Sequence, residues 1–270
     1  MTPFSLLLFS VDPTFIREAV AGGVQGIVVD WERVGKERRQ ASADTEINQH
    51  TLADLRAVRA TTEAQVICRI NGVHARTAEE VELALEAGAD ELLVPMVRHV
   101  AEVQTVLGLV RGRAKVGILV ETDAAVRGIG ALALLPLSRI YVGLNDLAID
   151  RRSDHIFRAV ADGTVEAVSR EVTGSFGFGG LTLPEEGSPV PCRLLMGELV
   201  RLGGSFSLLR RSFHRAVRGG DVRRGVEHIL EAVERCAARS HQEQHRDREE
   251  LLAVIRSLPG LRETPDRSAP

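Results

Sequence analysis

Short apolar runs alternate with amphipathic segments along most of the chain, and eight of these runs have the length of β-strands. Most are apolar at nearly every position instead of at every second one. Such runs are typical of parallel strands that are buried on both faces. The pattern therefore predicts eight strands, at Ser5–Ser10, Gly26–Trp31, Gln65–Ile70, Glu91–Pro95, Lys115–Glu121, Arg139–Gly143, Ser175–Gly179 and Ser205–Leu209.

The segments between these strands carry helix signals. Thr77-Ala78-Glu79-Glu80 has the spacing of a capping box, in which the Thr hydroxyl and the Glu carboxylate accept from unpaired amides at a helix start. We expect this helix to end at Gly88, because glycine adopts the left-handed conformation of a helix end at low cost. Gly23 and Gly203 precede the second and eighth strands in the same way.

Eight strand–helix units in 270 residues predict an α/β fold, a (β/α)8 TIM barrel in a single domain. An open, doubly wound sheet is the alternative, but its dinucleotide-binding form is disfavoured because no G-x-G-x-x-G follows an early strand. We predict that residues 1–240 form the barrel. Residues 241–270 are expected to form an extra C-terminal helix around Leu251–Leu258 and a flexible tail.

Composition and charge narrow the function classes. The net charge is −3 and aromatic residues make up 4% of the chain, which argues against a nucleic-acid partner. No apolar run approaches the roughly 20 residues that cross a bilayer, so we expect no membrane partner. The three cysteines have no metal-ligand spacing and fit reduced thiols in a cytoplasmic protein: Cys68, Cys192 and Cys236.

Polar residues stand at the C-terminal ends of four predicted strands, where barrel enzymes place their active sites. These residues are Asp30, Arg69, Glu121 and Asp146. Neighbouring carboxylates repel unless a cation lies between them, so Glu121 and Asp146 predict a divalent metal site. Alternatively, each acid caps the helix that follows it, and Arg69 makes a salt bridge without binding substrate.

The long connection Glu32–Thr51 leaves the same end of the barrel. Basic residues of this loop could bind an acidic group, although charged loops are more often only solvated: Arg33, Lys36, Arg38 and Arg39. Three histidines near predicted loops are weak candidates for proton transfer: His50, His74 and His99.

Five motifs occur in the order ICRING, GADELLVPMV, ILVETDAAV, YVGLNDLAID and FSLLRRSF. Together they resemble the HpcH/HpaI aldolase and citrate lyase β-subunit superfamily, from about Ser5 to Arg215. The resemblance implies a barrel of the phosphoenolpyruvate/pyruvate type that binds Mg²⁺, or Mn²⁺ or Co²⁺. It also implies the making or breaking of carbon–carbon bonds through a metal-bound enolate of pyruvate or another 2-oxo acid.

The resemblance assigns a role to each matching residue. It implies that Glu121 and Asp146 are the metal ligands and that Arg69 contacts the keto or enolate oxygen. It implies that the turn Gly143-Leu144-Asn145-Asp146 holds the 2-oxo acid carboxylate, through the backbone amides of Asn145 and Asp146.

The chain departs from the family pattern after the second strand. The stretch DWER puts Arg33 where aldolase members have a histidine that supports proton transfer, and it also differs from the D-L-E-D of CoA-linked lyases. The acid/base part of the catalytic site is therefore expected to involve Asp30, Arg33 and His50, with His50 or a metal-bound water as the substitute for the family histidine.

We therefore predict a divalent-metal-dependent, class II-type aldolase or lyase whose substrates are a 2-oxo acid and an aldehyde. An acyl-CoA lyase of the malyl- or citramalyl-CoA kind and a barrel without catalytic activity are the alternatives. The resemblance also implies a homo-oligomer, from dimer to hexamer, with the last helix exchanged between subunits. An apolar stripe along Gly225–Ala238 fits packing against a barrel, its own or a neighbour's.

Overall fold

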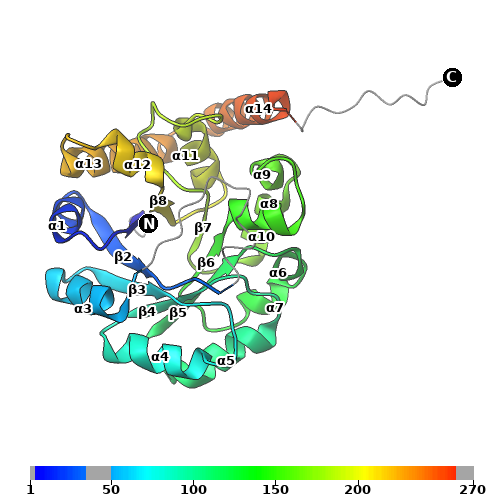
Figure 1. Cartoon of the computed structure of the whole chain (residues 1–270). Helices are drawn as coiled ribbons and strands as arrows, with labels where there is room; N and C mark the ends of the chain where they lie inside the picture. The colour runs from blue at the N-terminus through cyan, green and yellow to red at the C-terminus, as the bar shows by residue number, and fades with distance from the viewer. Residues whose placement is uncertain (1–3, 35–49, 260–270) are drawn as a thin grey trace.

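The computed structural model describes residues 4–34 and 50–259, which form a ring of strands surrounded by helices (Figure 1). Eight strands make one sheet in which every neighbouring pair is parallel, in the order β7-β6-β5-β4-β3-β2-β1-β8. All eight predicted strands are present, with ends within two residues of the prediction: β1 (Ser5–Phe9), β2 (Val24–Asp30), β3 (Gln65–Arg69), β4 (Glu91–Val94), β5 (Lys115–Val120), β6 (Arg139–Val142), β7 (Phe176–Phe178) and β8 (Phe206–Leu209).

The two ends of this order, β7 and β8, lie side by side and nearly close the sheet. The amide of Ser205, just before β8, donates to the Phe176 carbonyl at 2.9 Å. Beyond β7, Leu181 forms a parallel bridge with Leu209. The fold is therefore the predicted (β/α)8 TIM barrel, and the open doubly wound sheet is ruled out.

Helices pack around the outside of the strands and form the larger hydrophobic core with them. Positive φ angles occur at Gly23 (109°), Gly88 (91°) and Gly203 (73°), as predicted for helix ends. None of the helices in the described ranges is long and apolar enough to cross a membrane. The described helices are α1 (Pro13–Ala21), α3 (Leu52–Thr61), α4 (Thr77–Glu86), α5 (Val100–Val110), α6 (Asp123–Arg127), α7 (Ile129–Ala133), α8 (Leu144–Asp150), α9 (Arg158–Ala161), α10 (Thr164–Glu171), α11 (Cys192–Arg201), α12 (Arg211–Ala216), α13 (Val222–Ala237) and α14 (His241–Ser257).

The capping box predicted at the start of α4 is wrong. The N-cap residue is Arg76, and its side chain makes no capping bond. The Thr77 hydroxyl accepts from the His74 amide at 2.8 Å, and Glu80 Oε1 accepts from the side-chain amide of Asn71 at 2.6 Å. Both side chains therefore hold the turn that follows β3 instead of capping the helix.

Side chains fill the barrel interior and close its N-terminal end, so the C-terminal end is the one that can hold an active site. Glu91 accepts from Arg139 Nε and Nη2, both at 2.7 Å, and from Gln65 Nε2 at 2.7 Å, which closes the N-terminal end. Gly117 makes room there, because a Cβ would lie 2.7 Å from Arg139 Cγ. An apolar layer follows, made of Leu7, Val28, Ile67, Leu93, Leu119, Tyr141 and Phe206.

The last two helices pack on the chain's own barrel. In α13 the apolar stripe is buried at Val226, Ile229 and Val233, and this helix contacts α1 and α11. Helix α14 contacts α11 and begins ten residues before the predicted start, because Ser240 and Glu243 form a capping box there. Residues 260–270 lie outside the described part of the chain.

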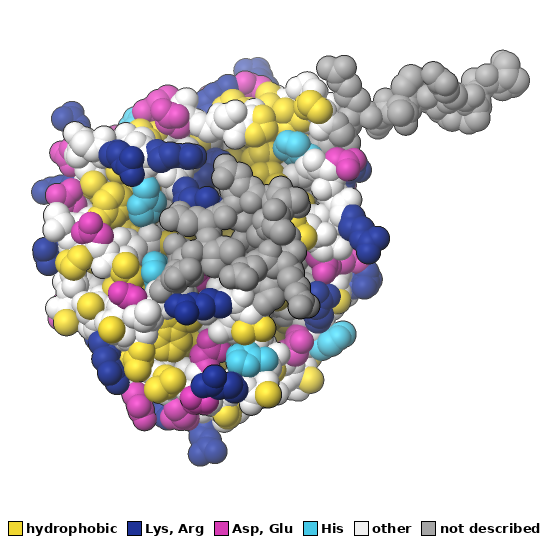
Figure 2. Space-filling view, in the orientation of Figure 1, with side chains coloured by type: hydrophobic (Ala, Val, Ile, Leu, Met, Phe, Trp, Pro, Cys, Tyr) yellow, Lys and Arg dark blue, Asp and Glu magenta, His cyan; other side chains and the backbone are white. Residues whose placement is uncertain are grey.

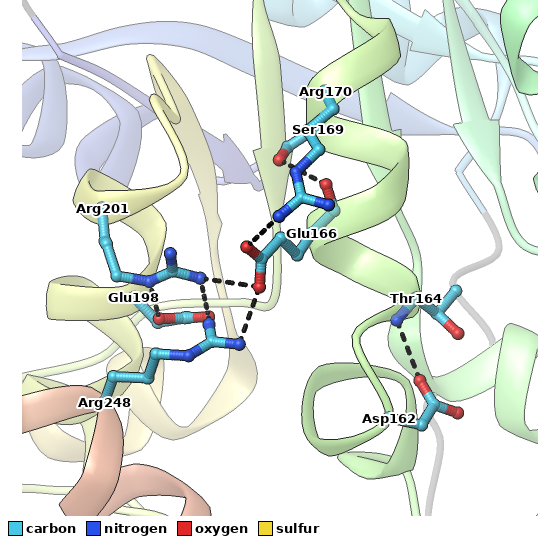
Figure 3. Close-up of polar contacts among 8 residues, drawn as sticks. All are labelled: Asp162, Thr164, Glu166, Ser169, Arg170, Glu198, Arg201 and Arg248. Atoms are coloured by element: carbon cyan, nitrogen blue, oxygen red, sulfur yellow. Dashed lines mark hydrogen bonds and ion pairs between the residues drawn. The ribbon is translucent and has the colours of Figure 1, made fainter. Parts of the chain in front are cut away.

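Ion pairs between α10, α11 and α14 fix the position of the last helix (Figure 3). Buried Glu198 of α11 accepts from Arg201 at 2.7 and 2.9 Å and from Arg248 of α14 at 2.5 Å. Arg248 also donates to Glu166 of α10 at 2.7 Å. A buried carboxylate is costly without partners, so this network ties α14 to one place on the barrel.

Candidate active site

The C-terminal ends of the strands surround a cavity of about 770 Å³ at the barrel mouth. Its lining includes six residues that the sequence assigned to the site, namely Arg69, Glu121, Gly143, Leu144, Asn145 and Asp146. Strands β3, β5 and β6 bring them together, because the carboxyl ends of parallel strands meet at one face of the barrel.

Arg69 is fixed by two acids of the neighbouring β2 strand. Its Nε and Nη2 donate to the two carboxylate oxygens of Asp30 at 2.8 and 2.7 Å, and Nη1 lies 3.4 Å from Glu32. The guanidinium also lies over the Phe9 ring, 4.9 Å from its centroid. Burial lowers the pKa of Arg69, but Asp30 and Glu32 more than offset this and raise it above its usual value. Arg69 is therefore a fixed cation at the mouth.

Glu121 follows β5 and is held by the chain after β4. Its Oε2 accepts from the amide of Met96 at 3.0 Å, and Met96 has a φ of 54°, in the left-handed region. A strained backbone of this kind persists only where the surrounding structure requires it. The pKa of the Glu121 carboxyl is raised to about 8, and burial is the largest cause. The negative charges of Asp146 and Glu32 also raise it, whereas the charge of Arg69 and the Met96 N–H lower it.

Gly143 brings the two predicted metal ligands close together. A Cβ at this position would lie 2.5 Å from Glu121 Cγ and 2.6 Å from its Oε1, so only glycine leaves room for the carboxylate. Gly143 is also the N-cap of α8, which places Asp146 in the first turn of that helix. The first amides of a helix, here those of Leu144, Asn145 and Asp146, have no acceptor within the helix.

The donor set fits a divalent metal ion. Arg69 pairs with Asp30 and lies 3.4 Å from Glu32, and the carboxylates of Glu121 and Asp146 are buried at the same mouth. After burial, the charges of Asp146 and Glu32 are the next causes of the raised pKa of Glu121, and a cation between the carboxylates would relieve this repulsion. No group of three or more metal-binding side chains occurs in the described residues. Mg²⁺ needs only one or two carboxylates and completes its shell with water and substrate oxygens, so two ligands suffice.

A family model described as HpcH/HpaI aldolase/citrate lyase matches residues 4–158, a range that contains Arg69, Glu121 and Asp146. The chain belongs to this family. Its members are lyases and aldolases that act on carbon–carbon bonds, and they generally depend on a divalent metal ion. The resemblance of the five sequence motifs to this family is thereby confirmed.

Solved structures share the fold of this HpcH/HpaI chain at low sequence identity. RipC from Yersinia pestis is 13% identical with a TM-score of 0.57, and the match covers 89% of this chain and 97% of that one. A citrate lyase from Burkholderia xenovorans LB400 is 15% identical with a TM-score of 0.59, covering 93% and 82%. The citrate synthase SbnG is 18% identical with a TM-score of 0.54, covering 81% and 91%. No curated protein matches the sequence.

Two candidate residues of the HpcH/HpaI chain lie away from the mouth cavity. His50 and Arg33 line a second cavity of about 510 Å³, beside Trp31 and Asn71. His50 Nδ1 accepts from the Asp30 amide at 3.0 Å, and its carbonyl accepts from Arg33 Nη2 at 2.9 Å. Both residues therefore support the end of β2, whereas Lys36, Arg38 and Arg39 lie outside the described residues.

The structure places Asp30 beside Arg69. It is fully buried, and besides both Arg69 bonds its Oδ1 accepts from the Glu32 amide at 3.2 Å. The carboxylate thus holds Arg69 in place, and it does not line the mouth cavity.

The sequence analysis missed the β8 side of the mouth. Arg210, Arg211 and His214 follow this strand and line the same cavity as Arg69 and Glu121. The signal is present in FSLLRRSF, because Arg210 follows β8 directly, as Glu121 follows β5.

Proposed function

We propose that this HpcH/HpaI chain is a divalent-metal-dependent, class II-type aldolase or lyase acting through the enolate of pyruvate or another 2-oxo acid. The observation that supports this most strongly is the juxtaposition of Arg69, Glu121 and Asp146 around one cavity. A fixed cation and two buried carboxylates suit a substrate that carries adjacent carboxylate and keto oxygens.

Glu121 and Asp146 would hold the cation, which supplies a positive charge that polarises the 2-oxo group and stabilises the enolate oxygen. Arg69 donates an N–H to the same oxygen from the fixed position that Asp30 gives it. The amides of Asn145 and Asp146 bind the 2-oxo acid carboxylate. Donors positioned before the reaction need no reorganisation when charge develops, which is the main source of rate enhancement in such sites.

The reaction starts when a water molecule in the mouth cavity accepts a proton from the methyl group of pyruvate, and the electron pair of the broken C–H bond moves toward the keto oxygen. In the synthetic direction the enolate carbon then attacks the carbonyl carbon of an aldehyde, forming the new carbon–carbon bond. The aldehyde oxygen takes up a proton. Cleavage follows the same steps in reverse. Phe9, Leu119 and Tyr141 line the cavity beside Arg69 and reduce the water around the developing charge.

Deuterium exchange of the pyruvate methyl protons tests this proposal without any knowledge of the aldehyde. With Mg²⁺ or Mn²⁺ present, the wild-type protein should catalyse the exchange, and a chelator should abolish it. Glu121→Ala and Arg69→Met should each reduce the rate by about 100-fold or more. Glu234→Ala, which removes an exposed carboxylate on α13, is the matched control and should leave the rate unchanged.

Wild-type protein that shows no exchange with any divalent ion would contradict the proposed chemistry. Retention on immobilised coenzyme A, together with exchange on a thioester but not on pyruvate, would favour the acyl-CoA lyase alternative. Cellular activity that survives Glu121→Ala would favour a barrel whose function does not involve the metal.

A further inference from the structure

Tyr141 is the only tyrosine of the chain, and its hydroxyl takes no part in the steps described above. The residue belongs to β6, and its ring packs against Phe206 in the apolar layer inside the barrel, with the ring centroids 5.7 Å apart. It is buried, yet it also lines the mouth cavity. A buried tyrosine ring at a cavity wall can present its hydroxyl to whatever the cavity binds.

The Tyr141 hydroxyl is held on the β8 side of the mouth. It is hydrogen-bonded to the hydroxyl of Ser207, a residue of β8. Ser207 Oγ donates its own proton to the Gly179 carbonyl at 2.6 Å, so its oxygen can accept from Tyr141. A serine hydroxyl rotates about its C–O bond, and Ser207 can therefore turn and donate to the phenolate after Tyr141 has lost a proton.

Two positioned arginines act on the same hydroxyl. Burial raises the pKa of Tyr141, and the positive charges of Arg210 and Arg69 oppose that rise. Asp30 fixes Arg69, and the Arg210 side chain is hydrogen-bonded to the Cys192 sulfur. The hydroxyl keeps its proton at neutral pH, so it can act as an acid. A negative charge that develops on its oxygen is stabilised by two cations that need not move.

The rim above this hydroxyl adds positive charge. The cavity lining includes Arg211 and Arg215 of α12 and Arg218, which follows that helix. Dark blue side chains gather over the region of α12 in Figure 2. Their potential favours the negative charge that the bond-forming step places on oxygen.

The groups assigned to the 2-oxo acid come from another part of the barrel. Arg69 ends β3, Glu121 follows β5, and the amides of Asn145 and Asp146 follow β6. These groups leave the β8 side of the mouth for the carbonyl group of the second substrate, and the Tyr141 hydroxyl is held on that side.

The other candidate proton donors are placed differently. Arg33 and His50 line the second cavity. His214 lines the mouth cavity, but its ring is stacked on Phe15 of α1, with the centroids 4.7 Å apart, so it belongs to the outer rim. His214 is therefore the rival that an experiment has to separate from Tyr141.

We propose that Tyr141 is the acid that gives a proton to the carbonyl oxygen of the aldehyde as the new carbon–carbon bond forms. The inference rests on the proposed aldolase or lyase function and names the donor of a proton that this function requires. As the enolate carbon attacks, the π electrons of the aldehyde C=O bond move onto its oxygen, which takes the Tyr141 hydroxyl proton. The phenolate then takes the proton that the cavity water accepted from the pyruvate methyl group, so no proton is gained or lost overall. Cleavage reverses these steps.

Tyr141→Phe separates proton donation from enolate formation, because it keeps the ring in the apolar layer and removes only the hydroxyl. Deuterium exchange of the pyruvate methyl protons involves no aldehyde and should stay close to the wild-type rate. The kcat for cleavage of the aldols of pyruvate with acetaldehyde and with glyoxylate should fall at least about 100-fold, with a smaller change in KM. Thr105→Val, which removes an exposed hydroxyl on α5, is the matched control and should change neither reaction.

The outcomes distinguish this inference from the proposed function. Wild-type protein without exchange would contradict the enolate chemistry itself. Wild-type exchange together with unchanged cleavage in Tyr141→Phe would overturn the role of Tyr141 alone. An equal loss of exchange and cleavage in Tyr141→Phe would overturn it as well, because it would indicate a structural effect. A loss of cleavage in His214→Gln but not in Tyr141→Phe would assign the proton to the rival.

The single tyrosine allows a second measurement that needs no turnover. Protein labelled with 3-fluorotyrosine gives a fluorine NMR signal from Tyr141 alone. With Mg²⁺ and oxalate bound, acetaldehyde or glycolaldehyde should shift this signal, because the aldehyde oxygen replaces Ser207 as the acceptor of the phenol proton. A signal that responds to neither aldehyde would overturn the inference, including the case in which the wild-type protein cleaves neither aldol.

Discussion

Asp30→Asn tests whether the buried carboxylate is the support of Arg69. The substitution keeps the size of the side chain but places an amide donor opposite a guanidinium donor, at contacts that are now 2.8 and 2.7 Å. Removing one partner of a buried ion pair costs about 3–5 kcal/mol. Glu32 lies 3.4 Å from Arg69 Nη1 and still offsets part of the arginine charge in the variant. We therefore expect the free energy of unfolding to fall by an amount near the lower end of this range, about 3 kcal/mol.

This loss converts to a measurable shift in the thermal midpoint. An unfolding entropy of about 2.1 cal/mol/K per residue gives about 0.57 kcal/mol/K for 270 residues, so the midpoint should fall by about 5 °C. Pyruvate deuterium exchange should fall as well, in kcat more than in KM, because Arg69 loses its orientation.

Glu82→Gln is the matched control for Asp30→Asn. It alters an equally close Arg113–Glu82 pair, with contacts of 2.7 and 2.6 Å, on the exposed surface, and should leave both the midpoint and the exchange rate unchanged. An Asp30→Asn protein with wild-type stability and wild-type exchange would refute the role of Asp30 as the support of Arg69.

Three further predictions follow from the same contacts. Because the pKa of Glu121 is raised to about 8, its carboxyl holds a proton below that pH, and a bound metal ion must displace this proton. The affinity for Mg²⁺ should therefore rise with pH and level off above about 8. Calorimetry in two buffers at about pH 6.5 should detect proton release on Mg²⁺ binding, and its absence would contradict the assignment of Glu121 as a ligand. Gly143→Ala should weaken metal binding at least about tenfold, because the new Cβ displaces the Glu121 carboxylate. Gly72→Ala is the control, because the nearest atom to its new Cβ is 3.6 Å away, and it should not weaken metal binding. Equal metal affinities in the two variants would contradict the close approach of Gly143 to Glu121. Arg248→Met removes charged partners from Glu198 and Glu166 and should destabilise the protein by about 2 kcal/mol in thermal unfolding, with no change in exchange rate; an unchanged midpoint would show that α14 is held by apolar contacts alone.

The barrel and the core of its site could be predicted from the sequence for a physical reason. Parallel strands buried on both faces are continuous apolar runs, so a polar residue directly after one marks the mouth of the barrel. Arg69 ends β3, Glu121 follows β5 directly and Asp146 lies in the first turn of the helix after β6, and all three line one cavity. The same rule applies to Arg210, which follows β8 directly.

The contacts of residues in loops were harder to predict from the sequence, because their side chains have several acceptors within reach. Thr77 and Glu80 have capping-box spacing, yet both bind the turn after β3. Arg33 and His50 face a second cavity, because the chain after β2 is held by Asn71, whose Oδ1 accepts from the Arg33 amide at 2.7 Å. Such contacts join residues far apart in sequence, and no local pattern encodes them.

Two buried carboxylates, those of Glu121 and Asp146, are the proposed metal ligands at the mouth of the barrel. Both line the mouth cavity beside Arg69, which Asp30 and Glu32 hold in place. The most direct measurement is a crystal structure of the protein with Mn²⁺ and oxalate, an analogue of the pyruvate enolate. The account predicts an anomalous peak bound by the Glu121 and Asp146 carboxylates, with an oxalate oxygen in hydrogen-bond contact with Arg69. Manganese bound elsewhere, or oxalate bound without Arg69, would contradict it.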